Sequence, residues 1–169
     1  FLEAQTQLFN IYQTTKEWSR AIELAENMIN AGGDSDELCA RVGHFYCEQA
    51  LIDWRKDDLI SAENYLNQAT RVDDKTVRPW LMLGELAMEN GQYELAIEHL
   101  SQVPLRDISW LSEAIPLIET CSEKLDDQSK LNSILDLYWQ QCATAYLAKV
   151  KLVAKEASSL EAAELLLQQ

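Results

Sequence analysis

Apolar side chains recur at helical spacing on both sides of a short polar break in the middle of the chain. Before the break they stand 3, 4 and 7 residues apart, on one face of a helix; they are Trp80, Leu83, Gly84 and Ala87. The break is Asn90-Gly91, and glycine adopts the positive φ that ends a helix without steric cost. A second apolar face follows, formed by Tyr93, Ala96, Ile97, Leu100 and Val103. The pattern predicts two helices joined by a tight turn.

This stretch resembles a tetratricopeptide repeat, a unit of two antiparallel helices with the pattern W-x2-L-G … G-x-Y-x2-A. Gly84 and Ala96 are small, as a close crossing of two helices requires. Trp80, Tyr93 and Leu100 are large, and we expect them to fill the gaps to the next unit. The resemblance predicts an all-α fold, a right-handed superhelix (α-solenoid) of about five helix pairs.

The same pattern divides the rest of the chain into helix pairs. Ala62 and Ala96, each in the second helix of its pair, are 34 residues apart, which is the expected period. The same step from Ala96 reaches Lys130, so the fourth unit is degenerate, through either a wider crossing angle or a one-residue shift. We predict a single tetratricopeptide-repeat domain, a fragment of a longer protein, with units at about residues 1–34, 36–74, 76–107, 108–141 and 143–169.

The apolar faces also predict which side chains are buried. In the first helix we expect Leu8, Ile11 and Tyr12 to face inward, and in the fourth unit we expect the same of Trp110. Residues 160–169 form the second helix of the last predicted unit. Because terminal repeats need a polar outer side, we expect its apolar face to contact residues outside this sequence.

The net charge of −14 restricts the partners that the chain can bind. An acidic surface repels nucleic acid phosphates and anionic lipid headgroups. We therefore expect no nucleic acid partner and no direct membrane insertion by this fragment. No apolar run approaches the roughly 18 residues that suggest a membrane-spanning helix, so we expect the fragment itself to be soluble.

The chemistry-bearing residues form no recognisable catalytic motif. The best candidate trio is His44, Cys47 and Glu48, which share one helix face and leave a cysteine hydrolase as one hypothesis. Such spacing also arises on the surface of any acidic helical chain, and no Gly-rich phosphate loop is present. The four cysteines lack the C-x-x-C spacing of metal knuckles. We predict that the chain is not an enzyme and has no catalytic, cofactor-binding or metal site.

What remains is a surface for protein binding. In stacked helix pairs, the first helices line the concave side, and helical phase selects the residues that face it. The predicted protein-binding groove consists of Asn10, Gln13, His44, Cys47, Leu51, Trp54, Arg78, Leu81, Glu85, Met88 and Glu119. It would hold a peptide or a helix along an apolar strip with acidic edges. The alternative is that some of these side chains pack against neighbouring helices or against another domain.

Three stretches together are similar to one family. They are L-F-N-I-Y-Q (8–13) followed by E-W-S-R-A-I-E-L-A-E (17–26), H-F-Y-C-E-Q-A-L (44–51), and G-Q-Y-E-L-A-I (91–97). In this order they resemble the middle of the bacterial lipopolysaccharide assembly protein B family. Tetratricopeptide units share many residues through their fold, but the fold does not dictate the H-F-Y-C-E run.

The resemblance implies an adaptor that regulates lipopolysaccharide (lipid A) biosynthesis. Such an adaptor helps present the committed-step deacetylase of the lipid A pathway to a membrane-bound ATP-dependent protease. The resemblance also implies a longer parent protein, with an N-terminal anchor that holds the repeats at the cytoplasmic face of the bacterial inner membrane. The parent's own C-terminal metal domain is a third expected partner of the repeats. That domain binds iron or zinc through a four-cysteine knuckle that is absent from this sequence. The alternative is a generic peptide-binding tetratricopeptide module of another cell-envelope or secretion assembly.

Overall fold

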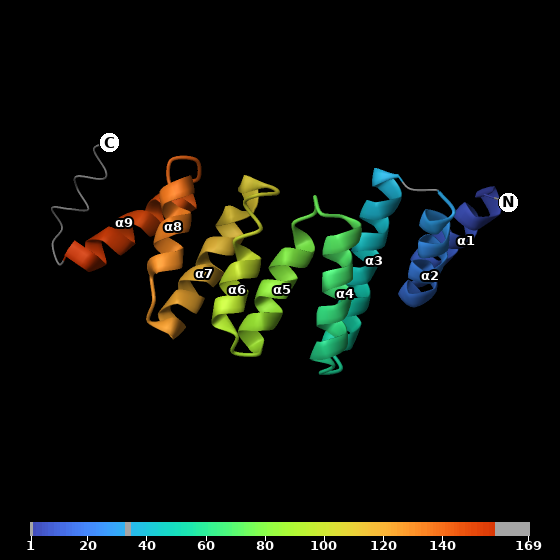
Figure 1. Ribbon diagram of the computed structural model, residues 1–169, viewed down its shortest axis with the longest axis horizontal. Coiled ribbons are helices and arrows are strands. Elements are labelled where there is room, and N and C mark those ends of the chain that lie inside the picture. Colours follow the sequence, from blue (N-terminus) through green and yellow to red (C-terminus); the bar gives the residue numbers. More distant parts are fainter. Residues whose placement is uncertain (1, 33–34, 158–169) are drawn as a thin grey trace. The chain divides into compact units, whose positions relative to one another are not determined.

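Helices account for all the regular structure in the described part of this protein. The structure is a computed structural model that describes residues 2–32 and 35–157 (Figure 1). Within these residues it has nine α-helices, one short 3-10 helix and no strand, which confirms the all-α fold class. The chain divides into two compact units between Leu86 and Ala87.

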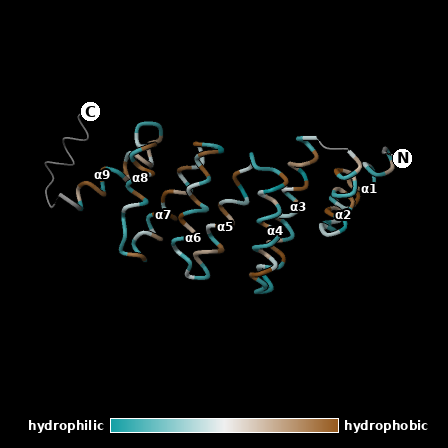
Figure 2. The backbone as a smooth tube through the Cα atoms, viewed as in Figure 1, coloured by the Kyte–Doolittle hydropathy of each residue, from teal (hydrophilic) through white to brown (hydrophobic). Residues whose placement is uncertain are grey.

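The first unit is built from consecutive helices that pack on one another. They are α1 (Leu2–Thr15), α2 (Trp18–Asn30), α3 (Asp36–Trp54), α4 (Leu59–Val72) and the start of α5 (Arg78–Glu89). α1 packs on α2, α2 on α3 and α3 on α4. Figure 2 shows apolar positions recurring between polar ones along these helices, as expected of helices that pack against neighbouring helices.

Side chains in the connecting turns determine where the long helices begin. The Ser35 hydroxyl accepts a hydrogen bond from the Leu38 N–H at 3.2 Å and caps α3. The Asp58 carboxylate accepts one from the Ser61 N–H at 3.1 Å and caps α4. These caps satisfy N–H groups that have no partner within the helix, so the polar residues of the turns fix the helix boundaries.

The close crossing in the first unit lies at a glycine that the repeat pattern does not select. Gly43 is buried in α3, and α4 packs over it. A Cβ built on Gly43 would lie 3.4 Å from Asp73 Cβ and 3.7 Å from both the Ala69 carbonyl oxygen and Val72 Cγ1. These are ordinary van der Waals distances, so α3 and α4 approach to about the separation that an alanine would allow.

The second unit continues the same construction. After the end of α5 it contains α6 (Tyr93–Leu100), the 3-10 helix η1 (Ile108–Trp110), α7 (Leu111–Leu125), α8 (Ser129–Tyr138) and α9 (Ala143–Ala157). The predicted turn is confirmed, because Gly91 has φ +72° and the Gln92 N–H donates to the Ala87 carbonyl at 2.8 Å. Ala96 is fully buried, as predicted. The second helix expected over residues 160–169 lies outside the described residues.

The predicted inward face of the first helix is wrong by one position. Leu8 and Ile11 are 39% and 54% exposed, whereas Phe9 is 1% exposed. The Phe9 ring lies 5.2 Å, centroid to centroid, from the ring of Phe45 on α3. The contact of Phe9 with Phe45, together with the packing of Tyr12, determines the rotation of α1 about its axis. Leu8 and Ile11 are therefore left exposed.

Two details of the fourth unit also follow from its local geometry. Trp110 is 43% exposed and not inward, because it ends η1 and the buried stripe of α7 starts one residue later at Leu111. At the degenerate register, Lys130 is exposed and its Nζ lies 3.5 Å from Glu98 Oε1, while Leu131 is buried. The buried position has therefore moved by one residue.

Candidate functional site

An arginine of α3 ties together two predicted groove residues of α1. Arg41 Nη2 donates hydrogen bonds to Asn10 Oδ1 at 2.7 Å and to Gln13 Oε1 at 2.6 Å. Its guanidinium carbon lies 4.3 Å from the centroid of the Phe9 ring, within the range of a cation–π contact. The groove residues of α1 and the face of α3 are thus brought together by a side chain that the sequence analysis did not select.

A second arginine makes the corresponding link between α3 and α5. Arg78 Nη2 donates to Glu48 Oε1 at 2.7 Å, and Arg78 Nη1 lies 2.8 Å from His44 Nδ1. A guanidinium only donates, so Nδ1 accepts and the ring carries its proton on Nε2. Partial burial and then the charge of Arg78 lower the pKa of His44, against the opposing effect of Glu48. Neutral His44 does not form an ion pair with Glu48, although 4.0 Å separates Nε2 from Oε1.

Aromatic side chains beneath this link hold the imidazole in place. The Trp18 ring meets the His44 ring edge-on, with centroids 6.2 Å apart and planes at 80°. Trp18 also packs on Phe45, at a centroid distance of 5.3 Å. His44 is therefore positioned by α2 from one side and by α5 from the other, which gives this exposed residue a defined orientation.

Cys47 does not line the predicted groove. It is 1% exposed because it belongs to the core of the first unit. Burial raises the pKa of its thiol to about 12, with only partial relief from the charge of Arg78. A cysteine nucleophile must be a thiolate near neutral pH, and the neighbouring His44 is engaged with Arg78. Both observations argue against the cysteine hydrolase hypothesis.

The apolar part of the predicted groove in the first unit is only half accessible. Leu51 and Trp54 are partly buried and pack against the core of the first unit. These two predicted groove residues therefore follow the alternative expectation, that some of the set pack against neighbouring helices. Leu81, also half-buried, and exposed Glu85 lie one and two turns after Arg78 on α5. Desolvation raises the pKa of the Glu85 carboxyl, although the residue as a whole is exposed.

The remaining groove candidates belong to the second unit. Met88 near the end of α5 and Glu119 on α7 are both half-buried. Glu119 borders a hollow of about 180 Å³ lined by residues of α7, α8 and α9 and the turn before α8; the others are Glu123, Gln128, Leu131, Ala148, Lys151, Leu152 and Lys155.

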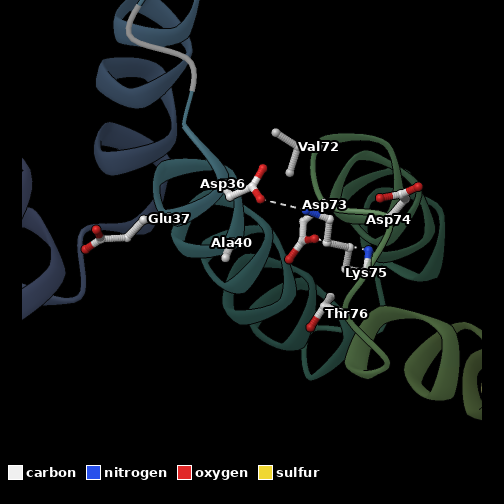
Figure 3. A pocket seen from close by; sticks show the side chains of 8 residues that line it. All are labelled: Asp36, Glu37, Ala40, Val72, Asp73, Asp74, Lys75 and Thr76. Carbon is white, nitrogen blue, oxygen red and sulfur yellow. Dashed lines mark hydrogen bonds and ion pairs between the residues drawn. The ribbon is translucent and has the colours of Figure 1, made fainter. Parts of the chain in front are cut away.

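A wider hollow in the first unit opens between the start of α3 and the turn from α4 to α5. Figure 3 shows its lining of short acidic and aliphatic side chains around Lys75. The Lys75 Nζ lies 2.7 Å from Asp36 Oδ2, and the Lys75 N–H donates to Asp73 Oδ1 at 3.1 Å. Within residues 2–32 and 35–157, no group of three or more His, Cys, Asp or Glu side chains could hold a metal ion. Two of the acidic residues of this hollow, Asp36 and Asp73, are thus engaged with Lys75.

Helix length and composition also bear on membrane contact. In the part of the chain that the structure describes, no helix combines the length and apolar character needed to cross a bilayer.

Helix pairs with small residues at their crossings define a tetratricopeptide-repeat fold. Residues 77–103 match the family described as Tetratricopeptide repeat, which is the stretch whose pattern predicts the clearest unit. A crystal structure of MamA protein aligns with 79% of this chain and 87% of its own, with a TM-score of 0.49 and 12% identity.

The curated relatives confirm the more specific resemblance. The chain is 36% identical over 122 residues to Lipopolysaccharide assembly protein B of Escherichia coli (strain K12), covering 72% of this chain and 31% of that protein. It is 30% identical over 125 residues to the protein of that name from Haemophilus influenzae, covering 73% and 30%. The matched region thus spans less than a third of the length of these relatives.

Proposed function

We propose that this chain is a non-enzymatic protein-interaction scaffold that acts in lipopolysaccharide assembly. The observation that carries the proposal is the 36% identity over 122 residues to Lipopolysaccharide assembly protein B. The geometry of the first unit supports it. Positioned polar side chains project from α1, α3 and α5. Cys47, the thiol of the cysteine hydrolase hypothesis, is buried and protonated.

At a finer level, we infer that the scaffold presents the committed-step deacetylase of lipid A synthesis to a membrane-bound ATP-dependent protease. The support is the resemblance carried by the first half of the chain. The same resemblance supports a parent protein held at the cytoplasmic face of the bacterial inner membrane, with its own C-terminal metal domain as a further partner of the repeats.

In the first unit, the best candidate surface for partner contact is the exposed face of α1, α3 and α5, each of which is the first helix of its pair. Asn10, Gln13 and His44 are exposed there. Each is held by an arginine from the first helix of the following pair. Side chains that are fixed before binding lose less entropy when a partner docks. We call this surface the front, and the exposed face of α4 the back; Asn64 and Gln68 on the back are also exposed and polar.

The test measures binding of the purified chain to the deacetylase and to the protease separately. The Gln13→Ala/His44→Ala double variant changes the front, and the Asn64→Ala/Gln68→Ala double variant changes the back as a matched control. We expect the front variant to weaken binding of at least one partner by tenfold or more, on the order of two lost hydrogen-bonding contacts, and the back variant to bind normally.

Two results would count against the proposal. Equal binding by the front and back variants would remove the first-helix face as the contact surface. Failure of the unaltered chain to bind either protein would remove the adaptor role, and capture of a different envelope protein would then favour the generic peptide-binding module.

A further inference from the structure

We propose that Arg41 is a receptor for a side-chain carboxylate, so that the first unit recognises an acidic segment of its partner. The inference rests on the proposed scaffold function and adds the chemistry of the segment that the scaffold binds. It starts from a charge that the chain itself leaves unpaired.

The guanidinium of Arg41 has no carboxylate partner among the described residues. Its two hydrogen bonds go to the neutral side-chain amides of α1. Two other arginines of the same unit are paired, Arg20 with Glu17 at 2.6 Å and Arg78 with Glu48 at 2.7 Å. Arg55 and Arg71 also have no ion pair among the described residues, but both are exposed, whereas Arg41 is partly buried and held by two hydrogen bonds. In a chain with 28 acidic residues against 14 basic ones, an unpaired and partly buried arginine stands out.

The geometry keeps this cation available for binding. A guanidinium carries five N–H donors, and the two of Nη2 are used by Asn10 and Gln13. The Nη1 and Nε donors have no acceptor in the described structure. Because the Phe9 ring and the two amides already fix the guanidinium plane, an incoming carboxylate meets donors whose orientation is set before it arrives.

The nearest internal competitor lies on α3 itself. Glu37 is exposed and stands four residues before Arg41, at a spacing that allows an ion pair on a helix. In the structure Arg41 turns to α1 instead, and an exposed pair of this kind is weak. A partner carboxylate therefore has little to displace.

The negative net charge of the chain increases the effect expected from removing Arg41. The chain carries −14 and repels an acidic partner at long range. Attraction must come from a local, positioned contact, so removing this single cation should have a large effect. Removing a cation elsewhere on the unit should have almost none.

The experiment follows the arginine Nε–H signals of the full chain by NMR during titration with acetyl-tetraglutamate amide, whose only carboxylates are side chains. We expect one Nε–H signal, assigned to Arg41 by its absence in Arg41→Gln, to shift on binding. Affinity for the peptide should fall about tenfold in Arg41→Gln, the loss expected for one charge-assisted contact. It should be unchanged in Arg71→Gln, which removes an exposed arginine from α4.

Arg41→Lys keeps the charge and guards against a loss of fold in the glutamine variant. We expect it to bind more weakly than the unaltered chain, because an ammonium lacks the planar fork. To distinguish side-chain carboxylates from other anions, acetyl-tetraalanine with a free terminal carboxylate and inorganic phosphate are titrated in parallel. An equal shift with either would overturn the side-chain assignment, and no shift with tetraglutamate would overturn the site.

Failure here and failure of the scaffold proposal are separable. If the unaltered chain and Arg41→Gln capture the deacetylase or the protease equally, the scaffold function stands and the carboxylate receptor is wrong. If the unaltered chain captures neither protein, the scaffold proposal fails and the tetraglutamate titration still decides the role of Arg41.

Discussion

Replacing Gly43 with alanine should stabilise the first unit, although the glycine sits at a helix crossing. Glycine in a helix interior costs about 1 kcal/mol relative to alanine, because it loses more backbone freedom on folding. The added Cβ would meet Asp73 Cβ at 3.4 Å and two other atoms at 3.7 Å. At these distances the methyl group gains contact without overlap, so the propensity gain should appear almost in full.

A larger side chain should reverse the sign. Gly43→Leu must place three carbon atoms beyond the Cβ where Asp73 and Val72 already lie, and overpacking of this kind costs about 1–3 kcal/mol. Ala40→Gly calibrates the series, since Ala40 is exposed on the same helix and should lose about 1 kcal/mol through propensity alone.

Urea unfolding of the full chain, followed by far-ultraviolet circular dichroism, measures these differences. The expected order of stability is Gly43→Ala above the unaltered chain, with Gly43→Leu and Ala40→Gly both below it. A loss of more than about 1 kcal/mol in Gly43→Ala would mean that the end of α4 lies too close to α3 for a methyl group at this position, and would refute the prediction.

Three further predictions test other parts of the structure. Because the folded chain lowers the pKa of His44, the unfolded state binds more protons below about pH 6.5; stability should fall as the pH drops from 7 to 5, and less steeply in His44→Gln. Iodoacetamide should modify the half-exposed Cys39 and Cys142 of the native chain first and the buried Cys47 and Cys121 last, since burial raises the pKa of both buried thiols, that of Cys47 to about 12, and early labelling of Cys47 by mass spectrometry would contradict this. Ala96→Leu should lower the midpoint of thermal unfolding through an overpacking cost of about 1–3 kcal/mol, because Ala96 is fully buried, and an unchanged midpoint would mean that α6 packs through another face.

The helices and turns could be predicted from the sequence because local chemistry determines them. Gly91 adopts the positive φ expected of it, and Ala96 is buried at the expected small-residue position. These features depend on residues close together in the chain. The rotation of α1 does not. It depends on Phe9 meeting Phe45, 36 positions further on, so an apolar pattern within one helix could not separate Phe9 from Leu8.

The candidate site was harder to predict for the same reason. Phase along one helix selected Asn10, Gln13 and His44 for the groove, and these residues are exposed, but it also selected Cys47, which lies in the core. A position near the edge of an apolar stripe can fall on either side of the packing boundary, and the neighbouring helix decides which.

The two arginine links indicate a rule by which such contacts could be predicted from sequence. Arg41 and Arg78 each belong to the first helix of a pair, and each reaches back to the first helix of the pair before it. An arginine is long enough to cross the gap between adjacent helices, and its planar donors can bind two acceptors at once. The acceptors stand three or four residues apart on the preceding helix, as one helical face requires. In a helical array, an arginine on a first helix whose predecessor carries two polar side chains at that spacing is therefore a candidate link. If the acceptors are neutral, the cation is left for a partner, and this separates Arg41 from Arg78.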